Sequence, residues 1–434
     1  MDKMADVLGR AGAWCGQNKY LSAIKNAFQN FMPLTIAGAI GVLWCNVLVN
    51  ESTGLGIFFK PIMALEFLNP AFQAVNFCTI SCITVGITLG IAQEIGVWNM
   101  GAEKAGYIPG LVGLAAWLSV TNTSHMVEGA KEAFTGIAGN ELGATGLFTG
   151  MIIGVLSVEL FCFFEKQDAL KIKMPEQVPP GVARAFEVLV PATITLIITA
   201  CIGSACYNLT GLYLNDVIKN GIQGPLGAVG ATIPGVMIIY LVIMLFWLVG
   251  IHGNNMLSAV KEALFTPLAL ENVEKFNKGE KPTNIINMYA LQMWGEFGGS
   301  GVTIGLVIAI MIFGKREDNK AIATLSLVPG LFNINETVTF GIPMVLNPIL
   351  GIPFVVAPLV TIIIGYVLTV IGFCPVACLT VPWTTPPIVF GFLACGANVM
   401  GPVTQAILIV VSTVIYVPFL IAYEKYQNKQ AAEA

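Results

Sequence analysis

The sequence predicts an all-α polytopic membrane protein with about ten transmembrane helices. Of its 434 residues, 56% are hydrophobic and only 11% are charged, and the mean hydropathy is +0.79. Soluble domains contain about 25% charged residues. The apolar residues are gathered into blocks that approach the roughly 20 residues a helix needs to cross the hydrocarbon core. Within these blocks, apolar and polar residues do not alternate as they do along the strands of a membrane β-barrel.

Eight strongly apolar blocks and two shorter ones account for the ten predicted spans. The strong blocks are residues 31–49, 74–91, 147–164, 188–206, 236–251, 301–313, 354–373 and 403–423. The shorter or glycine-rich ones are residues 108–120 and 387–399. Residues 165–187 form the longest polar stretch between strong blocks and contain three prolines. This stretch predicts a division into an N-terminal half, residues 1–186, and a C-terminal half, residues 187–434.

Basic residues predict the orientation, because cytoplasmic loops are enriched in lysine and arginine. Residues 1–25 are polar, carry four basic side chains and are expected to form a cytoplasmic leader rather than a cleavable signal peptide. The loops 165–187 and 271–284 also carry several basic residues and are expected on the cytoplasmic side. On the same count, loop 315–320 lies outside, although its charges nearly cancel, and the C-terminus returns to the cytoplasm.

No pattern in the sequence predicts a cofactor, a metal site or nucleic-acid binding. The ten cysteines are scattered through apolar segments, and none forms a CxxC pair. The chain has no GxxxxGK[ST] motif, so nucleotide hydrolysis by a P-loop is unsupported. It also has no basic cluster suited to nucleic acid.

A carboxylate between amides is the strongest functional signal. Asn333, Asn335 and Glu336 lie in a stretch interrupted by proline and glycine. Buried charge is costly in a membrane and usually faces a polar cavity, and irregular backbone at membrane depth is tolerated where it lines one. Glu336 can therefore accept hydrogen bonds from a polar solute or act as a general base. The alternative is a buried glutamate paired with a cation or a structural water.

Three further motifs add polar and aromatic groups. His252 lies between glycines after an apolar run, next to Asn254 and Asn255, and can donate, accept or move a proton near neutral pH. Ser300 lies in a glycine-rich stretch that permits close backbone approach, although helix packing explains it equally well. Trp383 lies between prolines and could cover one face of a sugar ring. It could equally be an interfacial anchor, and Trp247 has the same ambiguity.

Together these residues suit a neutral, hydroxyl-rich solute. Carboxylates and amides bind hydroxyls, and aromatic rings cover apolar sugar faces. A metal or anion site is less natural, because only one histidine and no arginine fall among the candidate residues.

These motifs resemble the sugar-transporting enzyme IIC components of the bacterial phosphotransferase system, in the lactose, cellobiose and diacetylchitobiose branch. The likeness lies in residues 331–336, in the Phe-Gly-Ile-Pro and Leu-Asn-Pro that follow, in residues 250–253 and 298–301, and in the entry segment around residues 26–34. It covers nearly the whole chain. Thr337 departs from the family pattern, which often has proline after the glutamate.

The resemblance implies a homodimer in the bacterial cytoplasmic membrane. Its N-terminal half would serve dimerisation, and its C-terminal half would hold the sugar with two re-entrant hairpins. Glu336 would be the general base, and His252 would assist binding or proton transfer at the hydroxyl that receives phosphate. The sugar-binding residues would be Asn333, Asn335, Asn254, Gly253, Trp383, Trp247 and Ser300.

The same resemblance implies that the phosphoryl group comes from outside this chain. A phosphocysteine-bearing IIB protein would supply it, itself loaded by a histidine-bearing IIA protein. The expected substrate is diacetylchitobiose or cellobiose. The rival hypothesis is a proton-coupled sugar symporter that uses Glu336 as its proton carrier, which composition and an intramembrane carboxylate also fit.

Overall fold

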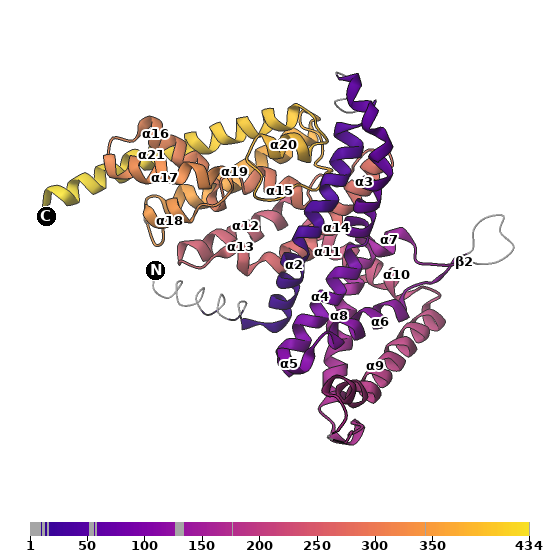
Figure 1. The fold of residues 1–434 in the computed structure, drawn as a ribbon. Coiled ribbons are helices and arrows are strands. Elements are labelled where there is room, and N and C mark those ends of the chain that lie inside the picture. Colours follow the sequence, from indigo (N-terminus) through magenta and orange to yellow (C-terminus); the bar gives the residue numbers. More distant parts are fainter. Residues whose placement is uncertain are drawn as a thin grey trace. The chain divides into compact units, whose positions relative to one another are not determined.

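The computed structural model describes residues 10, 14, 17–51, 56, 59–125, 134–175, 177–342 and 344–433. Most of the predicted leader, and Pro343 of the Phe-Gly-Ile-Pro motif, lie outside these residues. The described chain is mostly helical and forms two compact units (Figure 1). The first, called the N-terminal unit here, contains residues 17–35 and 77–227, and the second, called the C-terminal unit, combines residues 1–16, 36–76 and 228–434. The predicted functional boundary at residue 186 stays a prediction.

Helix α2 (Lys19–Leu43) contributes residues to both units. The other elements that begin in the N-terminal unit are η4 (Phe77–Ser81), α4 (Ile83–Met100), α5 (Ala102–Ala105), α6 (Ile108–Val120), β1 (Ser124–His125), β2 (Phe134–Thr135), α7 (Gly139–Leu142), α8 (Ala144–Glu165), η5 (Asp168–Leu170), α9 (Pro180–Thr210), α10 (Leu214–Ile218), η6 (Lys219–Gln223) and α11 (Gly224–Gly230).

Small residues let the helices of the N-terminal unit approach closely, as is common in membranes. A Cβ atom added at Gly113 of α6 would lie 2.3 Å from the Cβ of Ala92 in α4, and one at Gly150 of α8 would lie 2.2 Å from the hydroxyl of Thr88. The strands β1 and β2 form a two-residue antiparallel hairpin in which Ser124 pairs with Thr135.

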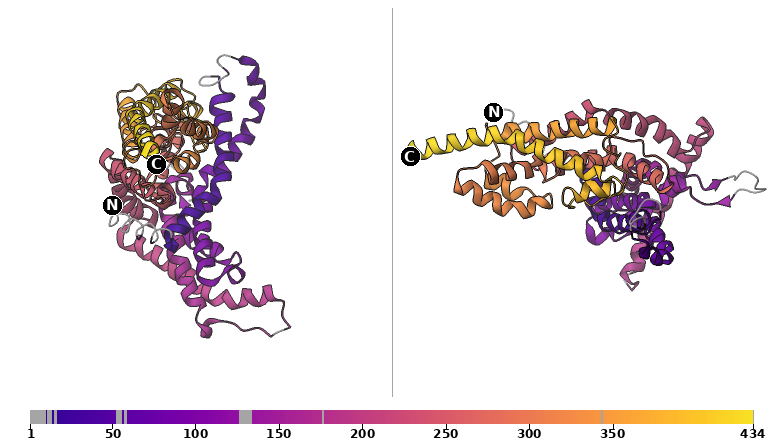
Figure 2. Two further views of the ribbon diagram at one scale, coloured as in Figure 1. Left: turned by 90° about the vertical axis from the view of Figure 1, so that its left-hand side faces the viewer. Right: turned by 90° about the horizontal axis from the view of Figure 1, so that it is seen from above.

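The C-terminal unit carries every residue of the predicted site. Its further elements are η1 (Trp44–Leu48), η3 (Lys60–Leu68), α3 (Asn69–Asn76), α12 (Ile233–Leu248), α13 (Gly253–Met256), α14 (Ser258–Asn277), α15 (Met288–Gly295), η7 (Ser300–Val302), α16 (Ile304–Phe313), α17 (Glu317–Leu331), α18 (Glu336–Gly341), α19 (Gly351–Val370), α20 (Val389–Ala394) and α21 (Met400–Glu433). Helix α21 packs beside α16 and α19, and its C-terminal end extends past them (Figure 2).

Side-chain caps fix where the broken helices of this unit begin. Thr232 accepts the backbone N–H of Gly235 at 3.2 Å at the start of α12, and the buried Asn287 accepts two N–H groups at the start of α15. Large buried aromatic residues fill the core between α12, α15, α19 and α21, notably Trp247, Trp294 and Tyr416. The Tyr416 hydroxyl donates to the carbonyl of Gly301 at 2.8 Å, which anchors the break before α16.

The helical, membrane-spanning part of the prediction is confirmed, and the number of spans stays a prediction. Among the described residues, five helices are long and apolar enough to cross a membrane, and two bent pairs raise this to seven. One bent pair joins Met288–Val302 to Ile304–Phe313 at 60°. Two shorter apolar helices, α6 and α12, are also present. To reach ten spans and two re-entrant hairpins, each bent pair and each short helix would have to be assigned either as a span or as part of a hairpin.

One contact in the structure bears on the predicted orientation. Glu424, near the C-terminal end of α21, accepts the backbone N–H of Lys315 at 2.9 Å and that of Arg316 at 3.3 Å. Loop 315–320 and the end of α21 therefore lie together, whereas the basic-residue count predicted that they lie on opposite sides. A loop with balanced charges carries little orientation signal, and the side of the membrane on which each lies stays a prediction.

Candidate functional site

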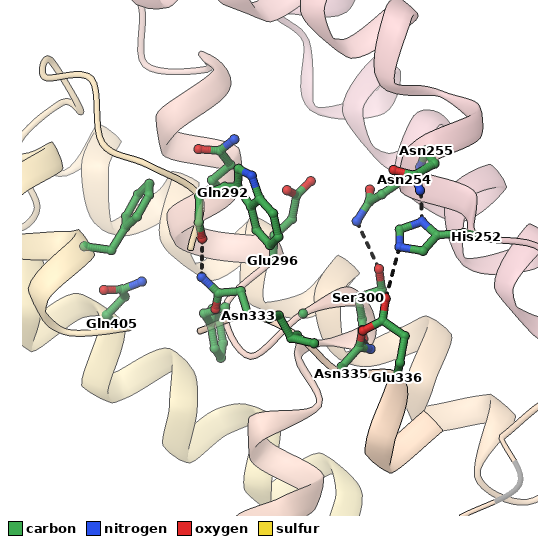
Figure 3. Close-up of a pocket in the computed structure, with 15 residues that line it drawn as sticks. His252, Asn254, Asn255, Gln292, Glu296, Ser300, Asn333, Asn335, Glu336 and Gln405 are labelled. Carbon is green, nitrogen blue, oxygen red and sulfur yellow. Dashed lines mark hydrogen bonds and ion pairs between the residues drawn. The ribbon is translucent and has the colours of Figure 1, made fainter. Parts of the chain in front are cut away.

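A polar cavity of about 340 Å³ lies within the C-terminal unit, a volume at the lower end of the range of small-molecule sites. Its lining residues come from α13 and the loop before it, α15, the glycine-rich break after α15, α18 and the loop before it, the loop before α20, and α20 and α21. They are His252, Asn254, Asn255, Gln292, Glu296, Phe297, Gly299, Ser300, Asn333, Ile334, Asn335, Glu336, Trp383, Phe390 and Gln405. Residues up to 153 positions apart in sequence thus meet at one site (Figure 3).

His252 and Glu336 lie together at one end of the cavity (Figure 3). The His252 Nε2 and Glu336 Oε1 atoms are 3.7 Å apart, and both side chains remain partly exposed. His252 caps α13, because its Nδ1 accepts the backbone N–H of Asn255 at 3.2 Å. In the neutral ring this contact leaves the proton on Nε2, the nitrogen that faces Glu336. The loop that carries His252 lies outside the helices that are long enough to cross the membrane. Burial lowers the pKa of His252, and the nearby Glu336 carboxylate opposes that shift.

Trp247 and Gly253 do not line the cavity, although both were predicted to bind sugar. Trp247 is only 2% exposed, and its ring centroid lies 4.4 Å from that of His252. It therefore supports the imidazole from behind. Gly253 is also buried, and a Cβ atom there would lie 2.0 Å from the carbonyl oxygen of Ile243. The glycine allows the chain to pass this close to α12.

Asn254, Ser300 and Asn335 form one hydrogen-bonded wall. The Asn254 amide donates to the Ser300 hydroxyl at 3.0 Å, and the Asn335 amide donates to the Ser300 carbonyl at 2.7 Å. Asn335 also donates to the Thr339 hydroxyl at 3.2 Å. These side chains line the cavity and at the same time fix its shape.

Asn333 joins the glycine-rich break to the Trp383 loop. Its side-chain oxygen accepts the backbone N–H of Gly298 at 2.6 Å. Its side-chain amide nitrogen donates to the backbone carbonyls of Trp383 and Thr385. The backbone of Asn333 has a φ of +62°, a conformation that asparagine adopts more readily than most residues. The Trp383 side chain, which is 44% exposed, is held at the cavity by this link.

Comparison with known proteins identifies the family. The family model described as "Phosphotransferase system, EIIC" matches residues 25–358. The chain belongs to this family. Two similar relatives are the oligo-beta-mannoside-specific EIIC component of Bacillus subtilis, 33% identical with 98% of this chain and 94% of the relative covered, and the cellobiose-specific EIIC component of Lactococcus lactis, 30% identical with 98% of each chain covered.

A solved structure has the same fold. The crystal structure of ChbC, described as the IIC component from the N,N'-diacetylchitobiose-specific phosphotransferase system, matches with a TM-score of 0.88 at 30% identity, covering 97% of each chain. The family resemblance inferred from the sequence motifs is therefore confirmed. As an EIIC component, the chain is an integral membrane protein of a sugar phosphotransferase system.

The structure of this EIIC component also adds cavity residues that were not predicted as site residues. Asn255, Gln292, Glu296 and Gln405 all line the cavity. Gln405 interrupts the apolar sequence of α21, and its side-chain oxygen accepts the N–H groups of Ile388 and Gly391 at 2.7 and 2.8 Å. A single amide in a strongly apolar helix is the signal that could have identified it. Gln292 and Glu296 are one turn apart in sequence, but nothing in the sequence places them opposite His252.

Proposed function

We propose that this EIIC component binds a neutral β-linked disaccharide of the cellobiose or diacetylchitobiose kind and translocates it into the bacterial cytoplasm, where a separate IIB protein phosphorylates it. The His252–Glu336 pair beside a cavity lined with amides is the observation that carries the proposal. The cellobiose, oligo-beta-mannoside and diacetylchitobiose names of the similar proteins support the substrate class.

The proposed chemistry assigns Glu336 as the general base. Its carboxylate takes the proton of a sugar hydroxyl while the hydroxyl oxygen attacks the phosphorus of a phosphocysteine on IIB. An oxygen–phosphorus bond forms, the sulfur–phosphorus bond breaks, and the cysteine leaves as a thiolate. The His252 Nε2–H can donate to Glu336 or to the sugar oxygen, so it orients the base and the reacting group.

The opposite end of the cavity would hold the second sugar ring. Figure 3 places Gln292 and Gln405 well away from His252 and Glu336. Trp383 would cover an apolar ring face, and the amides of Asn333 and Asn335 would keep the surrounding loops in place. The homodimer, the dimerising role of the N-terminal half, the re-entrant hairpins and the dependence on IIA through IIB remain parts of this proposal.

Transport by vesicles that contain only this chain tests the proposal against a proton symporter. We expect no disaccharide phosphate until a phosphorylated IIB protein is added, because no residue of the proposed site supplies a phosphoryl group. Formation of the product should then persist when a protonophore removes the proton gradient. Accumulation of unmodified sugar driven by a proton gradient alone would instead establish the symporter.

A further inference from the structure

A second carboxylate, Glu296, lines the cavity and has a buried counter-ion. Glu296 follows α15, and its carboxylate forms an ion pair with the ammonium group of Lys261 in α14. Lys261 is only 5% exposed. The hydroxyl of the fully buried Tyr240 also donates to Glu296 Oε1, at 2.6 Å. Since an unpaired charge is costly in a protein interior, these contacts act as one unit.

We propose that Glu296 is a sugar-binding residue and that Lys261 is the positioning residue that holds it, an inference that rests on the proposed disaccharide function. Both Lys261 and Tyr240 contact Oε1 of Glu296. No hydrogen bond to Oε2 occurs among the described residues, and this oxygen is not buried. A carboxylate has about four lone-pair sites, so Glu296 retains acceptors for a sugar hydroxyl in the cavity. A hydrogen bond to a carboxylate is stronger than one to a neutral acceptor.

The surroundings of the two cavity carboxylates give them different roles. Glu336 faces His252, a group that can exchange a proton with it. Glu296 faces the ammonium group of Lys261 and the hydroxyl of Tyr240, and both donate hydrogen bonds to its carboxylate. Glu296 is therefore suited to hold the sugar during the reaction at Glu336.

Lys261 acts through a second contact as well. Its ammonium group donates to the Asn254 side-chain oxygen at 3.4 Å, and the Asn254 amide donates to Ser300 at 3.0 Å. Lys261 itself does not line the cavity. From this position outside the cavity lining, it orients two residues that do line the cavity, Glu296 and Asn254.

The arrangement also defines the charge of the substrate. Two glutamates line the cavity, and none of the described residues that line it is lysine or arginine. Lys261, which does not line the cavity, is already paired with Glu296. The cavity therefore favours neutral disaccharides over sugar acids, because like charges repel and no cation is available to a carboxylate on the ligand.

The test compares the binding of cellobiose and diacetylchitobiose to purified parent protein and five variants by calorimetry, with thermal unfolding measured in parallel. Glu296→Gln should weaken binding about ten- to hundredfold, the range for a hydrogen bond to a charged group. Lys261→Met should lower both affinity and thermal stability, because it removes the counter-ion of the Glu296 carboxylate, and Lys261→Arg should recover part of each. The double variant Lys261→Met/Glu296→Gln should regain stability but not affinity. Glu280→Gln, in an exposed loop, is the matched control.

Three results separate the possible failures. If folded Glu296→Gln binds as tightly as the parent, or if the double variant regains full affinity, the pair is structural and the inference is wrong. If the parent binds the uronic acid of cellobiose as tightly as cellobiose, the charge selectivity is wrong. If the parent binds neither disaccharide, the proposed function itself fails and the inference fails with it.

Discussion

Glu336 and His252 are the residues on which the proposed chemistry depends. Glu336→Gln keeps the shape of the side chain and part of its hydrogen bonding but cannot accept a proton. We expect near-normal disaccharide binding with the rate of sugar phosphorylation reduced by about 10²–10⁴-fold, the usual contribution of a general base. The measurement is product formation with phosphorylated IIB at saturating sugar.

Glu317→Gln is a matched control for this change. The Glu317 side chain is 87% exposed at the start of α17 and takes no part in the cavity. It should leave the phosphorylation rate unchanged. A Glu336→Gln protein that forms sugar phosphate at the rate of the Glu317→Gln protein would exclude Glu336 as the base.

Trp383 should contribute to affinity rather than to assembly. A sugar ring presents C–H groups on one face, and covering them with an indole stabilises the complex by dispersion and burial. We expect Trp383→Ala to cost about 1–2 kcal/mol, or ten- to thirtyfold in affinity, and Trp383→Phe to recover part of it. Calorimetry with cellobiose or diacetylchitobiose measures this. Unchanged affinity would make Trp383 an interfacial anchor.

At the residue scale, the sequence predicted the site only in part. Glu336, His252 and Asn335 were found because charge and amides in broken apolar sequence have few structural explanations. Trp247 was also selected, but the structure buries it behind His252, and nothing local distinguishes a buried tryptophan from a ligand-facing one. Glu296 was not selected, because its partner Lys261 lies 35 positions away in the sequence.

At the element scale, the break between α15 and α16 shapes the cavity wall. Gly299 has a φ of +87°, and a Cβ atom there would lie 2.6 Å from the side-chain carbon of Asn335. Gly299→Ala should therefore lower stability by about 3 kcal/mol or more, from backbone strain and overpacking together, and should weaken disaccharide binding. Thermal unfolding in detergent and calorimetry measure the two effects.

Gly279 provides a matched control, because its substitution by alanine tests the loss of stability from backbone strain alone, without overpacking. Its φ is +73°, but no atom lies within 4 Å of an added Cβ. Gly279→Ala should lose only the conformational part, about 1–2 kcal/mol, with sugar binding intact. Equal losses of stability and binding in both variants would show that the close approach of Gly299 to Asn335 does not matter.

The same elements show where prediction from sequence stops. Long apolar helices such as α8 and α19 were expected in nearly their observed positions, because a long run of apolar residues is enough to indicate a candidate span. The bend of 60° between residues 288–302 and 304–313 was not located, because it depends on tertiary contacts such as that between Tyr416 and Gly301. Proline and glycine indicate that a break occurs, but not its angle.

At the scale of the whole molecule, we predict from α21 which loops share a side of the membrane. Its C-terminal end holds loop 315–320 through Glu424. Near its other end, an added Cβ at Gly396, four residues before α21, would lie 3.0 Å from the ring of Phe276, which lies within residues 271–284. Residues 400–430 are long and apolar enough to span the bilayer. Loops 271–284 and 315–320 should therefore lie on opposite sides, with the C-terminus on the side of loop 315–320.

Single cysteines at Glu280, Glu317 and Lys425, in a background without the native cysteines, test this arrangement. All three positions are exposed. A membrane-impermeant maleimide applied to sealed, oriented vesicles should label Glu317→Cys and Lys425→Cys together, and should reach Glu280→Cys only after the vesicles are opened, or the reverse in vesicles of the opposite orientation. Phosphorylation by added IIB in the same vesicles then identifies the cytoplasmic side. Labelling of Glu280→Cys and Lys425→Cys from the same side would mean that α21 does not cross the membrane between Gly396 and Glu424.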